Sequence, residues 1–555
     1  MSDGSDNQLL FVPLGGAGEI GMNLNLYAYG DAWIIVDLGI TFADSYLPGV
    51  EILMPDPSFI EERRDKLLGI VLTHAHEDHL GAVAHLWPRL RCPVYATPFA
   101  GTILGSKLSE TGIEAEVPLY EIPRAGAFTL GPFDIRYFPI THSIAEANGL
   151  VIRTPAGTIF HTGDWKFDSD PVICPPTDEA ALKALGDEGV LALVCDSTNV
   201  FNQTESGSEA AVGDNLREVL ADHPGRILVT TFASNIARLA SLGRAAVALD
   251  RHLCLVGRSL IRNVEVARAL GYLDGFPPLV DESEVGYLPR EKVMIVSTGC
   301  QGEGRAALSR IAQGQHRHIA LGEGDLVVFS SKQIPGNELA IGRLINNLAE
   351  QGIKVMTERD AFIHVSGHPS RPELERMYDL IRPEIAVPVH GERRHLMAHA
   401  ELARQKGAKQ AVVVTNGKVV RLAPGPAEVV DEVKVGRLAL DGDRLVPVDG
   451  DVIATRRRIM YNGYLGVAVA VDGDGHLLAK PSLDLQGIPG GEAGGPVEAA
   501  ILRALDRATE GFKEAVRRDD RHLAEGLRIV ARRAAKAATG KETGPITKVH
   551  VIRVQ

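Results

Sequence analysis

The sequence predicts an α/β protein of several domains, and three observations carry this prediction. Strand-like segments dominate residues 9–196, whereas strands and helices alternate strictly over residues 226–356. A cluster of histidines and acidic residues, Thr73–His79, directly follows an apolar strand. The chain of 555 residues is too long for a single core, so about three or four domains are expected.

The composition is that of a globular protein, with 45% hydrophobic and 23% charged residues. No apolar run reaches the roughly 18 residues of a membrane span, and the polar segment 1–7 lacks the basic start of a secretory signal. The five cysteines are scattered and form no CxxC pair, so we expect reduced thiols and a cytoplasmic enzyme. The net charge of −13 argues against a protein that coats nucleic acid. It leaves a nuclease open, because a local basic groove or bound metal ions can attract phosphate.

The first part of the chain contains short apolar or alternating segments that are typical of strands. The apolar stretch 67–72 predicts a buried strand, and residues 80–86 after it predict a helix. The same pattern returns later as strands at 386–389 and 411–422, with a helix through Lys406 between them. Further strands are predicted at residues 9–14, 23–29, 33–36, 134–140, 151–154, 158–161 and 191–196.

Between these two parts, strict alternation predicts a parallel sheet wrapped by helices, which would form a domain of its own. Its first helices are predicted at residues 236–249 and 260–270. Its strands are predicted at residues 226–232, 252–256, 293–297, 325–330 and 353–356.

Beyond Pro424, turns rich in Gly, Asp and Pro predict a linker. The last helix of the chain carries a basic face formed by Arg528, Arg532, Arg533 and Lys536, which is either a solvated helix surface or a contact for phosphate. From about Asp451 onward we expect a small α/β domain with strands at 459–461, 467–471 and 549–554, helices at 496–510 and 521–537, and a flexible loop over 486–491.

The segment Gly16–Gly21 matches the GxGxxG pattern of dinucleotide-binding proteins and follows a predicted strand. A dinucleotide site requires a helix after the glycines, because the helix N-terminus holds the pyrophosphate. Residues 22–29 alternate with period two instead, which is typical of a strand. We therefore expect a hairpin turn that lines a cleft, without a bound dinucleotide.

The loop after the strand 67–72 holds His74, His76, Asp78 and His79 in an HxHxDH pattern. Neutral imidazoles and carboxylates suit zinc or manganese. The alternative is a solvated polar loop that happens to be rich in histidine, although such residues rarely gather directly after an apolar strand.

Three further residues of ligand type follow predicted strands, namely His142, Asp164 and His390. Each of them, considered alone, would more often be structural or exposed. Active sites of α/β proteins gather at the carboxyl ends of strands, so together with the HxHxDH loop these residues predict a centre for two metal ions.

The order Asp37, HxHxDH, His142 and Asp164 resembles the metallo-β-lactamase fold over roughly residues 8–205 and 360–425. The inserted α/β stretch, followed by His364-Val365-Ser366-Gly367-His368 and His390, is similar to the β-CASP branch, which acts on nucleic acids. The segments Gly15–Asn23 and Ser330–Glu338 and the C-terminal domain are similar to the ribonuclease J family of bacteria. The resemblance implies a metallo-β-lactamase αββα sandwich over 1–205 and 359–425, a β-CASP parallel-sheet domain over 206–358, a linker over 426–455 and a small C-terminal α/β domain over 456–555.

The resemblance also implies how the metal ligands are divided. Asp37 would orient the histidine loop through hydrogen bonds. Two ions about 3.5–4 Å apart can activate a shared water and clamp the phosphorus, and zinc is expected, with manganese as the alternative. One divalent ion would be held by His74, His76 and His142, the other by Asp78, His79 and His390, and Asp164 would bridge them.

For the substrate, the resemblance implies that His364, Val365, Ser366, Gly367 and His368 bind a backbone or terminal phosphate. Serine hydroxyls, imidazoles and backbone N–H groups beside glycine can all donate to phosphate. His368 is also the candidate proton donor for the leaving 3′ oxygen, and the alternative for the whole segment is a polar turn at a domain junction.

A second phosphate contact is suggested by Phe232-Ala233-Ser234-Asn235, which lies at a strand end and before a helix. A helix N-terminus with Ala233, Ser234 and Asn235 suits a phosphate group, and the alternative is an ordinary helix cap. Ser330 and Ser331 occupy a similar position at another strand end.

These implications predict a two-metal ribonuclease that degrades single-stranded, 5′-monophosphorylated RNA from the 5′ end in RNA decay and maturation, with some internal cleavage. Asp78 would act in catalysis as a metal ligand, and the products would carry a 5′ phosphate and a 3′ hydroxyl. The rivals are a DNA nuclease of the same branch, a small-molecule hydrolase and a catalytically silent RNA-binding scaffold. A homodimer, partners in an RNA-decay assembly and a structural calcium near Gly49-Val50-Glu51 and Asp443 are further expectations.

Overall fold

The computed structural model describes residues 7–44, 46–334 and 336–554. Most of the polar start 1–7 and Pro335 of the Ser330–Glu338 segment therefore lie outside the described residues. The chain divides into two compact units, of which the first contains residues 1–41 and 54–435 and the second residues 42–53 and 436–555. Within the described ranges, none of the helices combines the length and the apolar character needed to cross a bilayer.

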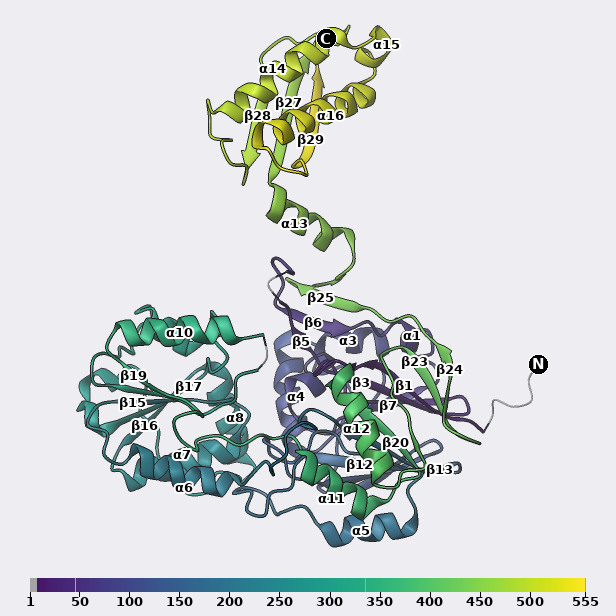
Figure 1. Cartoon of the computed structure of the whole chain (residues 1–555), viewed down its shortest axis with the longest axis vertical. Coiled ribbons are helices and arrows are strands. Elements are labelled where there is room, and N and C mark those ends of the chain that lie inside the picture. The colour runs from purple at the N-terminus through teal and green to yellow at the C-terminus, as the bar shows by residue number, and fades with distance from the viewer. Residues whose placement is uncertain (1–6, 45, 335, 555) are drawn as a thin grey trace. The chain divides into compact units, whose positions relative to one another are not determined.

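Two sheets lie face to face in the first unit, with helices on their outer sides (Figure 1). The sheet that carries the HxHxDH loop consists, in spatial order, of β24 (Glu428–Glu432), β23 (Lys418–Ala423), β1 (Leu9–Gly15), β3 (Leu24–Tyr29), β4 (Ala32–Val36), β7 (Leu67–Val71), β8 (Val94–Ala96) and β9 (Leu119–Glu121). The facing sheet consists of β10 (Ala127–Leu130), β11 (Phe133–Pro139), β12 (Asn148–Thr154), β13 (Gly157–His161), β14 (Ala192–Asp196), β20 (Ile385–Val389) and β22 (Gln410–Ala411).

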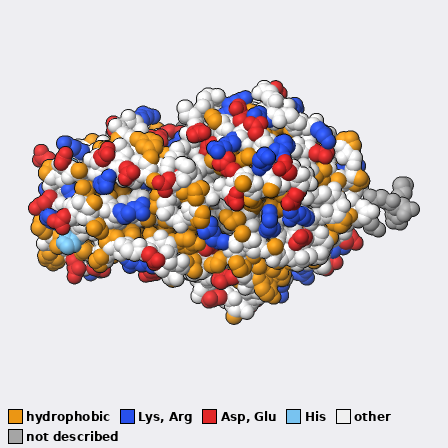
Figure 2. Space-filling model, turned by 90° about the horizontal axis from the view of Figure 1, so that it is seen from below, with side chains coloured by type: hydrophobic (Ala, Val, Ile, Leu, Met, Phe, Trp, Pro, Cys, Tyr) orange, Lys and Arg blue, Asp and Glu red, His pale blue; other side chains and the backbone are white. Residues whose placement is uncertain are grey.

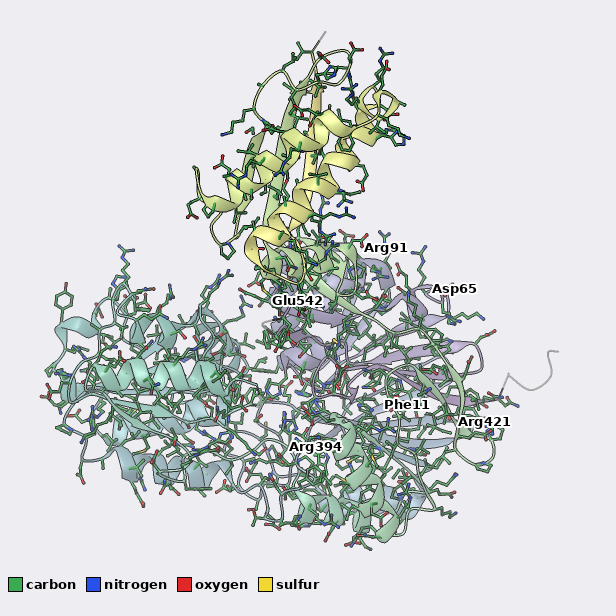
Figure 3. The ribbon with its side chains drawn as sticks, turned by 45° about the horizontal axis from the view of Figure 1, so that its top comes forward. Phe11, Asp65, Arg91, Arg394, Arg421 and Glu542 are labelled. Atoms are coloured by element: carbon green, nitrogen blue, oxygen red, sulfur yellow. The ribbon has the colours of Figure 1, made fainter. Side chains whose placement is uncertain are left out.

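The core of this sandwich is filled by side chains from both sheets. Phe11, which is labelled in Figure 3, and Ile34 belong to one sheet, and Ile135 and Leu150 to the other. Burying one such side chain stabilises the fold by about 1.5–3 kcal/mol. The predicted αββα sandwich is therefore confirmed, with outer helices α3 (Val83–Leu90), α4 (Pro98–Thr111), α5 (Glu179–Glu188), α11 (Arg371–Ile381) and α12 (Arg393–Gln405).

The alternating stretch forms the predicted parallel sheet with its own core. Figure 1 shows α10 (Glu338–Glu350) on one side of this sheet and α6 (Glu209–Leu220) and α7 (Ile236–Ala248) on the other. The strand order is β16 (His252–Val256), β17 (Val293–Ser297), β15 (Ile227–Thr230), β18 (Leu326–Phe329) and β19 (Lys354–Met356), and α8 (Arg258–Ala269) follows β16.

The second unit contains a three-stranded sheet covered by helices. Its strand β27 (Tyr464–Val471) lies between β28 (Ser482–Gln486) and β29 (Ile546–Arg553), antiparallel to the first and parallel to the second. Apolar side chains such as Val467, Val469 and Leu527 form its core. The helices are α13 (Asp451–Asn462), α14 (Pro496–Gly511), α15 (Glu514–Arg517) and α16 (Asp520–Thr539).

Several sequence expectations differ from the structure, among them the helix predicted at 80–86, which is divided between the end of α2 (Glu77–Leu80) and the start of α3 by a turn. Residues 459–461 lie in the last turn of helix α13 and do not form a strand. Their apolar side chains are exposed, and Ile453 is the buried residue of this helix. The predicted strand 411–422 is divided into β22 and β23 by a turn at Gly417, whose φ is 89°. The predicted linker contains β24 together with β25 (Arg437–Asp441) and β26 (Arg444–Pro447). All five residues of β24 are exposed and therefore give no alternating signal.

One face of the molecule mixes both signs of charge. Figure 2 shows Lys and Arg side chains interspersed with Asp and Glu over the face that it displays, with apolar side chains between them. The net charge of −13 is thus not gathered into one acidic patch on this face.

Candidate metal centre

All seven predicted ligands lie together at one edge of the sandwich. They follow strands β7, β11, β13 and β20, whose carboxyl ends meet there. In each of two groups, one possible ligand atom per residue lies within 4.8 Å of the others. The first group is His74, His76, His142 and Asp164, and the second is Asp78, His79, Asp164 and His390.

The first group presents imidazole nitrogens to one another at close range. His76 Nδ1 lies 3.1 Å from His74 Nε2 and 3.0 Å from His142 Nε2. Burial lowers the pKa of His74 and His142 well below the ordinary value, and lowers the pKa of His76 to about 4. The three rings are therefore neutral near pH 7, and their lone pairs are available to a cation.

The second group mixes imidazoles with carboxylates. Asp78 Oδ2 lies 3.1 Å from His390 Nε2, and Asp164 Oδ2 lies 3.2 Å from His79 Nε2. Burial by itself would raise the pKa of Asp164, but the imidazoles of His390 and His79 hold that pKa well below its usual range. The Asp164 carboxylate is therefore ionised.

The chemistry of the donor set fits divalent cations. Asp164 Oδ1 is buried and accepts no hydrogen bond from the described residues. A buried carboxylate oxygen without a partner is costly unless a cation lies beside it. Imidazole nitrogens and carboxylate oxygens converging from two sides on Asp164 are the ligands that zinc and manganese take in proteins.

A second layer of contacts fixes the ligand rings. Asp37 accepts hydrogen bonds from Thr73 N (2.7 Å) and Thr73 Oγ1 (2.8 Å), and its Oδ2 lies 2.7 Å from His79 Nδ1. Such contacts fix the tautomer and the orientation of a ligating histidine. Asp37 and His390 both have positive φ values, 63° and 50°, and strain of this kind in non-glycine residues gathers at functional sites.

The Nδ1 atoms of His142 and His390 are held by contacts with other parts of the first unit. His142 Nδ1 lies 2.5 Å from Gly367 O, and His390 Nδ1 lies 2.9 Å from Thr198 Oγ1. The HxSxH segment therefore contacts the metal cluster directly through Gly367.

The glycine-rich segment forms the predicted hairpin turn, because β1 and β3 on either side of it pair as antiparallel strands. A Cβ placed on Gly21 would lie 3.4 Å from Asp78 Cβ, and His390 N donates to Gly16 O at 2.7 Å. The glycines thus bring backbone close to two ligands, and no helix follows them to hold a pyrophosphate.

Sequence reasoning missed Asp196, which ends β14. Its Oδ2 lies 2.8 Å from His368 Nδ1, and His368 Nδ1 lies 3.8 Å from Asp164 Oδ2. Burial opposes a charge on His368, but Asp196 and Asp164 raise its pKa above the ordinary value. An apolar strand that ends in a carboxylate, as in the segment 191–196, is the signal that could have identified Asp196.

The residues predicted to contact phosphate fall into two classes. Ser234 Oγ lies 3.1 Å from His76 Nε2, and His364 Nδ1 is buried without a hydrogen-bond partner among the described residues. Asn235, in contrast, caps α7 by accepting from Arg238 N, and Ser366 Oγ accepts from Asn199 Nδ2. His364 Nδ1 is therefore free to bind a ligand, whereas Ser234, Asn235 and Ser366 already make hydrogen bonds within the protein.

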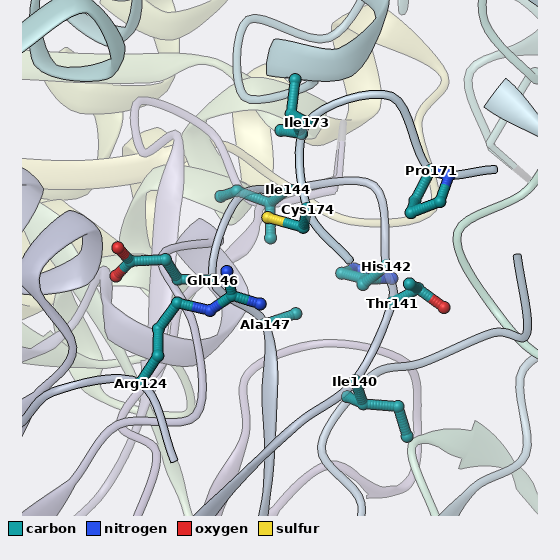
Figure 4. Close-up of a pocket in the computed structure, with 10 residues that line it drawn as sticks. All are labelled: Arg124, Ile140, Thr141, His142, Ile144, Glu146, Ala147, Pro171, Ile173 and Cys174. Carbon is teal, nitrogen blue, oxygen red and sulfur yellow. The ribbon is translucent and has the colours of Figure 1, made fainter. Parts of the chain in front are cut away.

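A small hollow lies on the other side of His142 (Figure 4). In it Glu146, whose φ is 54°, accepts hydrogen bonds from Phe99 N (2.8 Å) and from the hydroxyl of Tyr272 (2.5 Å), which follows α8. None of the predicted phosphate-binding residues lines this hollow, which is formed by Arg124, Ile140, Thr141, His142, Ile144, Glu146, Ala147, Pro171, Ile173 and Cys174.

Comparison with protein families gives three matches along the chain. Residues 33–184 match the beta-lactamase superfamily domain, residues 224–348 the beta-CASP domain of ribonuclease J, and residues 352–414 the RNA specificity domain of Zn-dependent metallo-hydrolases. The three matched stretches cover both parts of the sandwich and the parallel-sheet insertion.

Whole-chain comparison identifies close relatives. The sequence is 44% identical to a ribonuclease J of Sinorhizobium meliloti, with 99% of this chain and 98% of the relative covered. It is 38% identical to a ribonuclease J of Mycobacterium tuberculosis, with 93% and 92% covered. A crystal structure of a protein of unknown function from Enterococcus faecalis shares the fold over 75% of this chain and all of its own, with a TM-score of 0.50 and 16% identity.

Proposed function

Since the chain belongs to the ribonuclease J family and is a metal-dependent ribonuclease, we propose that it removes nucleotides from the 5′ end of single-stranded RNA, with some internal cleavage. The observation that supports this proposal is the buried Nδ1 of His364, which has no hydrogen-bond partner among the described residues and belongs to the segment that contacts His142 through Gly367. A pocket that binds a terminal phosphate next to the scissile bond would favour cleavage from that end.

Seven side chains would hold the metal ions in this proposal. His74, His76 and His142 would bind one ion, Asp78, His79 and His390 the other, and Asp164 would bridge them, with zinc as the expected metal and manganese as the alternative. When bound, the two ions supply Lewis acidity that activates water and stabilises charge on the phosphate. The calcium near Gly49-Val50-Glu51, the homodimer and the decay-assembly partners stay predictions.

His368 would protonate the leaving group. Its Nδ1 is held by Asp196 at 2.8 Å, which leaves Nε2 as the atom that can donate a proton. In-line attack of water forms a new P–O bond, and the water releases a proton to solvent. The bond from phosphorus to the 3′ oxygen breaks, and that oxygen takes the proton from Nε2. The phosphate then remains on the 5′ end of the next nucleotide, and the released nucleotide has a 3′ hydroxyl.

A buried ion pair contacts the chain neighbours of the proposed phosphate contacts. Arg238 and Glu209 are fully buried and lie 3.0 Å apart. The Arg238 guanidinium also donates to Ser330 O (3.0 Å), Ser330 Oγ (2.5 Å) and Ile363 O (3.1 Å), and Glu209 accepts from Asn235 Nδ2 (3.3 Å). The pair therefore fixes a chain neighbour of each proposed phosphate contact, namely Asn235 beside Ser234, Ser330 beside Ser331, and Ile363 beside His364.

Cations also lie around His364, of which Arg238 is paired with Glu209 and Lys166 with Asp168. Burial lowers the pKa of His364 well below its ordinary value, and Arg238, Lys332 and Lys166 lower it further. An anion in this pocket would be attracted by these cations and would accept hydrogen bonds from the serine hydroxyls.

Matched RNAs that differ only at the 5′ end test this proposal. RNA with a 5′ monophosphate is expected to be degraded faster than the same RNA with a 5′ hydroxyl or triphosphate. Arg238→Lys keeps a positive charge opposite Glu209 but loses the planar guanidinium and its fixed set of N–H donors. The variant is therefore expected to show a smaller preference for the 5′ monophosphate, with unchanged metal content. Equal rates on all three RNAs with the native enzyme would refute the 5′-end pocket, and faster cleavage of matched DNA would favour the DNA nuclease.

Gly367→Ala is expected to weaken metal binding by roughly 10- to 100-fold. A Cβ on Gly367 would lie 2.8 Å from His142 Cε1 and Nδ1, so the ligand ring must shift. Metal titration into the demetallated protein measures the effect. Gly304→Ala is the control, because no atom lies within 4 Å of a Cβ there, and equal affinities for the two variants would contradict the assignment of His142.

A further inference from the structure

The C-terminal domain has a charge balance opposite to that of the whole chain. Residues 456–555 contain seventeen Lys and Arg against twelve Asp and Glu, whereas the full sequence has 58 against 71. Acidic side chains of α16 are engaged locally, since Glu525 pairs with Arg528 and Asp520 with Arg553. The excess positive charge is therefore carried by cations other than Arg528 and Arg553.

Part of that charge gathers in a groove between α16 and the segment that follows it. Glu542, labelled in Figure 3, belongs to this following segment. Arg528, Arg532 and Lys536 are spaced by four residues, so they share one face of the helix. The groove is lined by Arg528, Ile529, Arg532, Arg533, Lys536, Glu542, Thr543 and Gly544.

Three of these cations have no acidic partner. Among the described residues, Arg532, Arg533 and Lys536 form no ion pair, whereas Arg528 is engaged by Glu525. Like charges four residues apart destabilise a helix by roughly 0.2–0.5 kcal/mol per pair. The helix dipole compensates for cations in the last turn, where only Lys536 lies. Arg532 and Arg533 therefore have no ion pair within the described residues that would offset the repulsion between neighbouring cations.

One of the arginines is held in place by packing. A Cβ on Gly544 would lie 2.9 Å from Arg532 Cγ and 3.4 Å from Arg532 Nε. The absence of a side chain at Gly544 lets the Arg532 stem lie against the backbone of the following segment. A guanidinium fixed in this way loses less conformational entropy when it binds an anion.

The chemistry of the lining selects the kind of ligand. The cations extend over eight residues of helix, or about 12 Å, which suits a chain of phosphates better than a single one. None of the described residues that line the groove is aromatic. The groove therefore offers no ring on which an RNA base could stack. We propose that this groove binds the sugar–phosphate backbone of RNA, independently of base sequence and separately from the metal centre.

Neutralising the groove tests this proposal, which rests on RNA being the substrate as proposed above. In the full-length metal-loaded enzyme, the triple variant Arg532→Gln, Arg533→Gln, Lys536→Gln is expected to raise KM for an RNA of about 30 nucleotides roughly tenfold at low salt. The slope of log KM against log salt concentration is expected to fall by about 2, since each lost phosphate contact of a single strand contributes about 0.7. The kcat/KM for an RNA of about four nucleotides should stay unchanged, because so short a chain can occupy the metal centre alone.

A control with the same change in charge separates a groove from a general electrostatic effect. The variant Lys480→Gln, Arg503→Gln, Arg507→Gln removes three exposed cations of the same domain outside the groove. It is expected to leave both KM and the salt slope close to those of the native enzyme. Equal losses in the two triple variants, or native behaviour of the groove variant, would overturn the proposal.

Two further measurements keep the outcome unambiguous. Circular dichroism and the thermal midpoint of both variants verify that the domain is folded. If the groove variant lost binding to vesicles containing phosphatidylserine but kept native KM for RNA, the ligand would be a lipid headgroup and the RNA proposal would be wrong. Equal rates of the native enzyme on RNAs with different 5′ ends would refute the proposed 5′-end preference without changing the groove result, so the two failures are distinguishable.

Discussion

Asp164→Asn is expected to lower kcat/KM on RNA by about a thousandfold or more, which corresponds to about 4 kcal/mol of transition-state stabilisation. Asp164 belongs to both ligand groups, and its Oδ1 accepts no hydrogen bond from the described residues. An amide at this position offers a neutral oxygen in place of a charged one. The variant is therefore expected to bind fewer than two divalent ions per chain, which elemental analysis of the same sample measures.

The matched control for this variant is Asp170→Asn. Asp170 is an exposed carboxylate near Asp164 in the sequence, and the structure places it in neither ligand group. Its activity and metal content should equal those of the native enzyme. An Asp164→Asn variant with full metal content and full activity would contradict the bridging role.

His368→Gln is expected to lower kcat by roughly 10²- to 10⁴-fold, the usual contribution of a general acid, with little change in metal content. The readout that isolates this role is a substrate in which sulfur replaces the 3′ oxygen of the scissile bond. A thiolate leaves without protonation, so the variant should cleave this substrate nearly as fast as the native enzyme does. A merely structural role of His368 would slow both substrates equally.

His85→Gln serves as the control for that experiment, because His85 lies on α3 outside every ligand group. Asp196→Asn is expected to behave as a milder version of His368→Gln. The loss of the carboxylate weakens the orientation of the imidazole but leaves Nε2 in place. Unchanged kcat in Asp196→Asn would show that the 2.8 Å contact does not position the proton donor.

The fold could be predicted from the sequence where burial is periodic. The parallel sheet was predictable because its strands, such as β17, are buried along their whole length and alternate with amphipathic helices. The end of α13 was not, because Ile459, Met460 and Tyr461 are exposed by 38%, 47% and 53% and therefore carry no periodic signal. Strand β28 was missed although its five residues alternate between exposed and half-buried, because so short an alternation at the edge of a sheet is a weak signal.

More of the metal site than of the substrate site could be predicted from the sequence. Imidazoles and carboxylates at strand ends identify ligands by residue type alone, and the structure brings all seven together. Asp196 was missed because its partner His368 lies 172 residues away, and one carboxylate at a strand end is a weak signal. Whether Asn235 caps a helix or contacts phosphate depends on where its side-chain oxygen points, and the structure directs it to Arg238 N.

Time-resolved product analysis on end-labelled RNA, with metal content measured on the same sample, tests the central claim most directly. The account predicts that 5′-labelled RNA releases labelled mononucleotide first, that each remaining fragment keeps its 3′ end and gains a 5′ phosphate, and that about two divalent ions per chain are required. Fragments that shorten progressively from the 3′ end, or full activity after complete removal of metal, would contradict it.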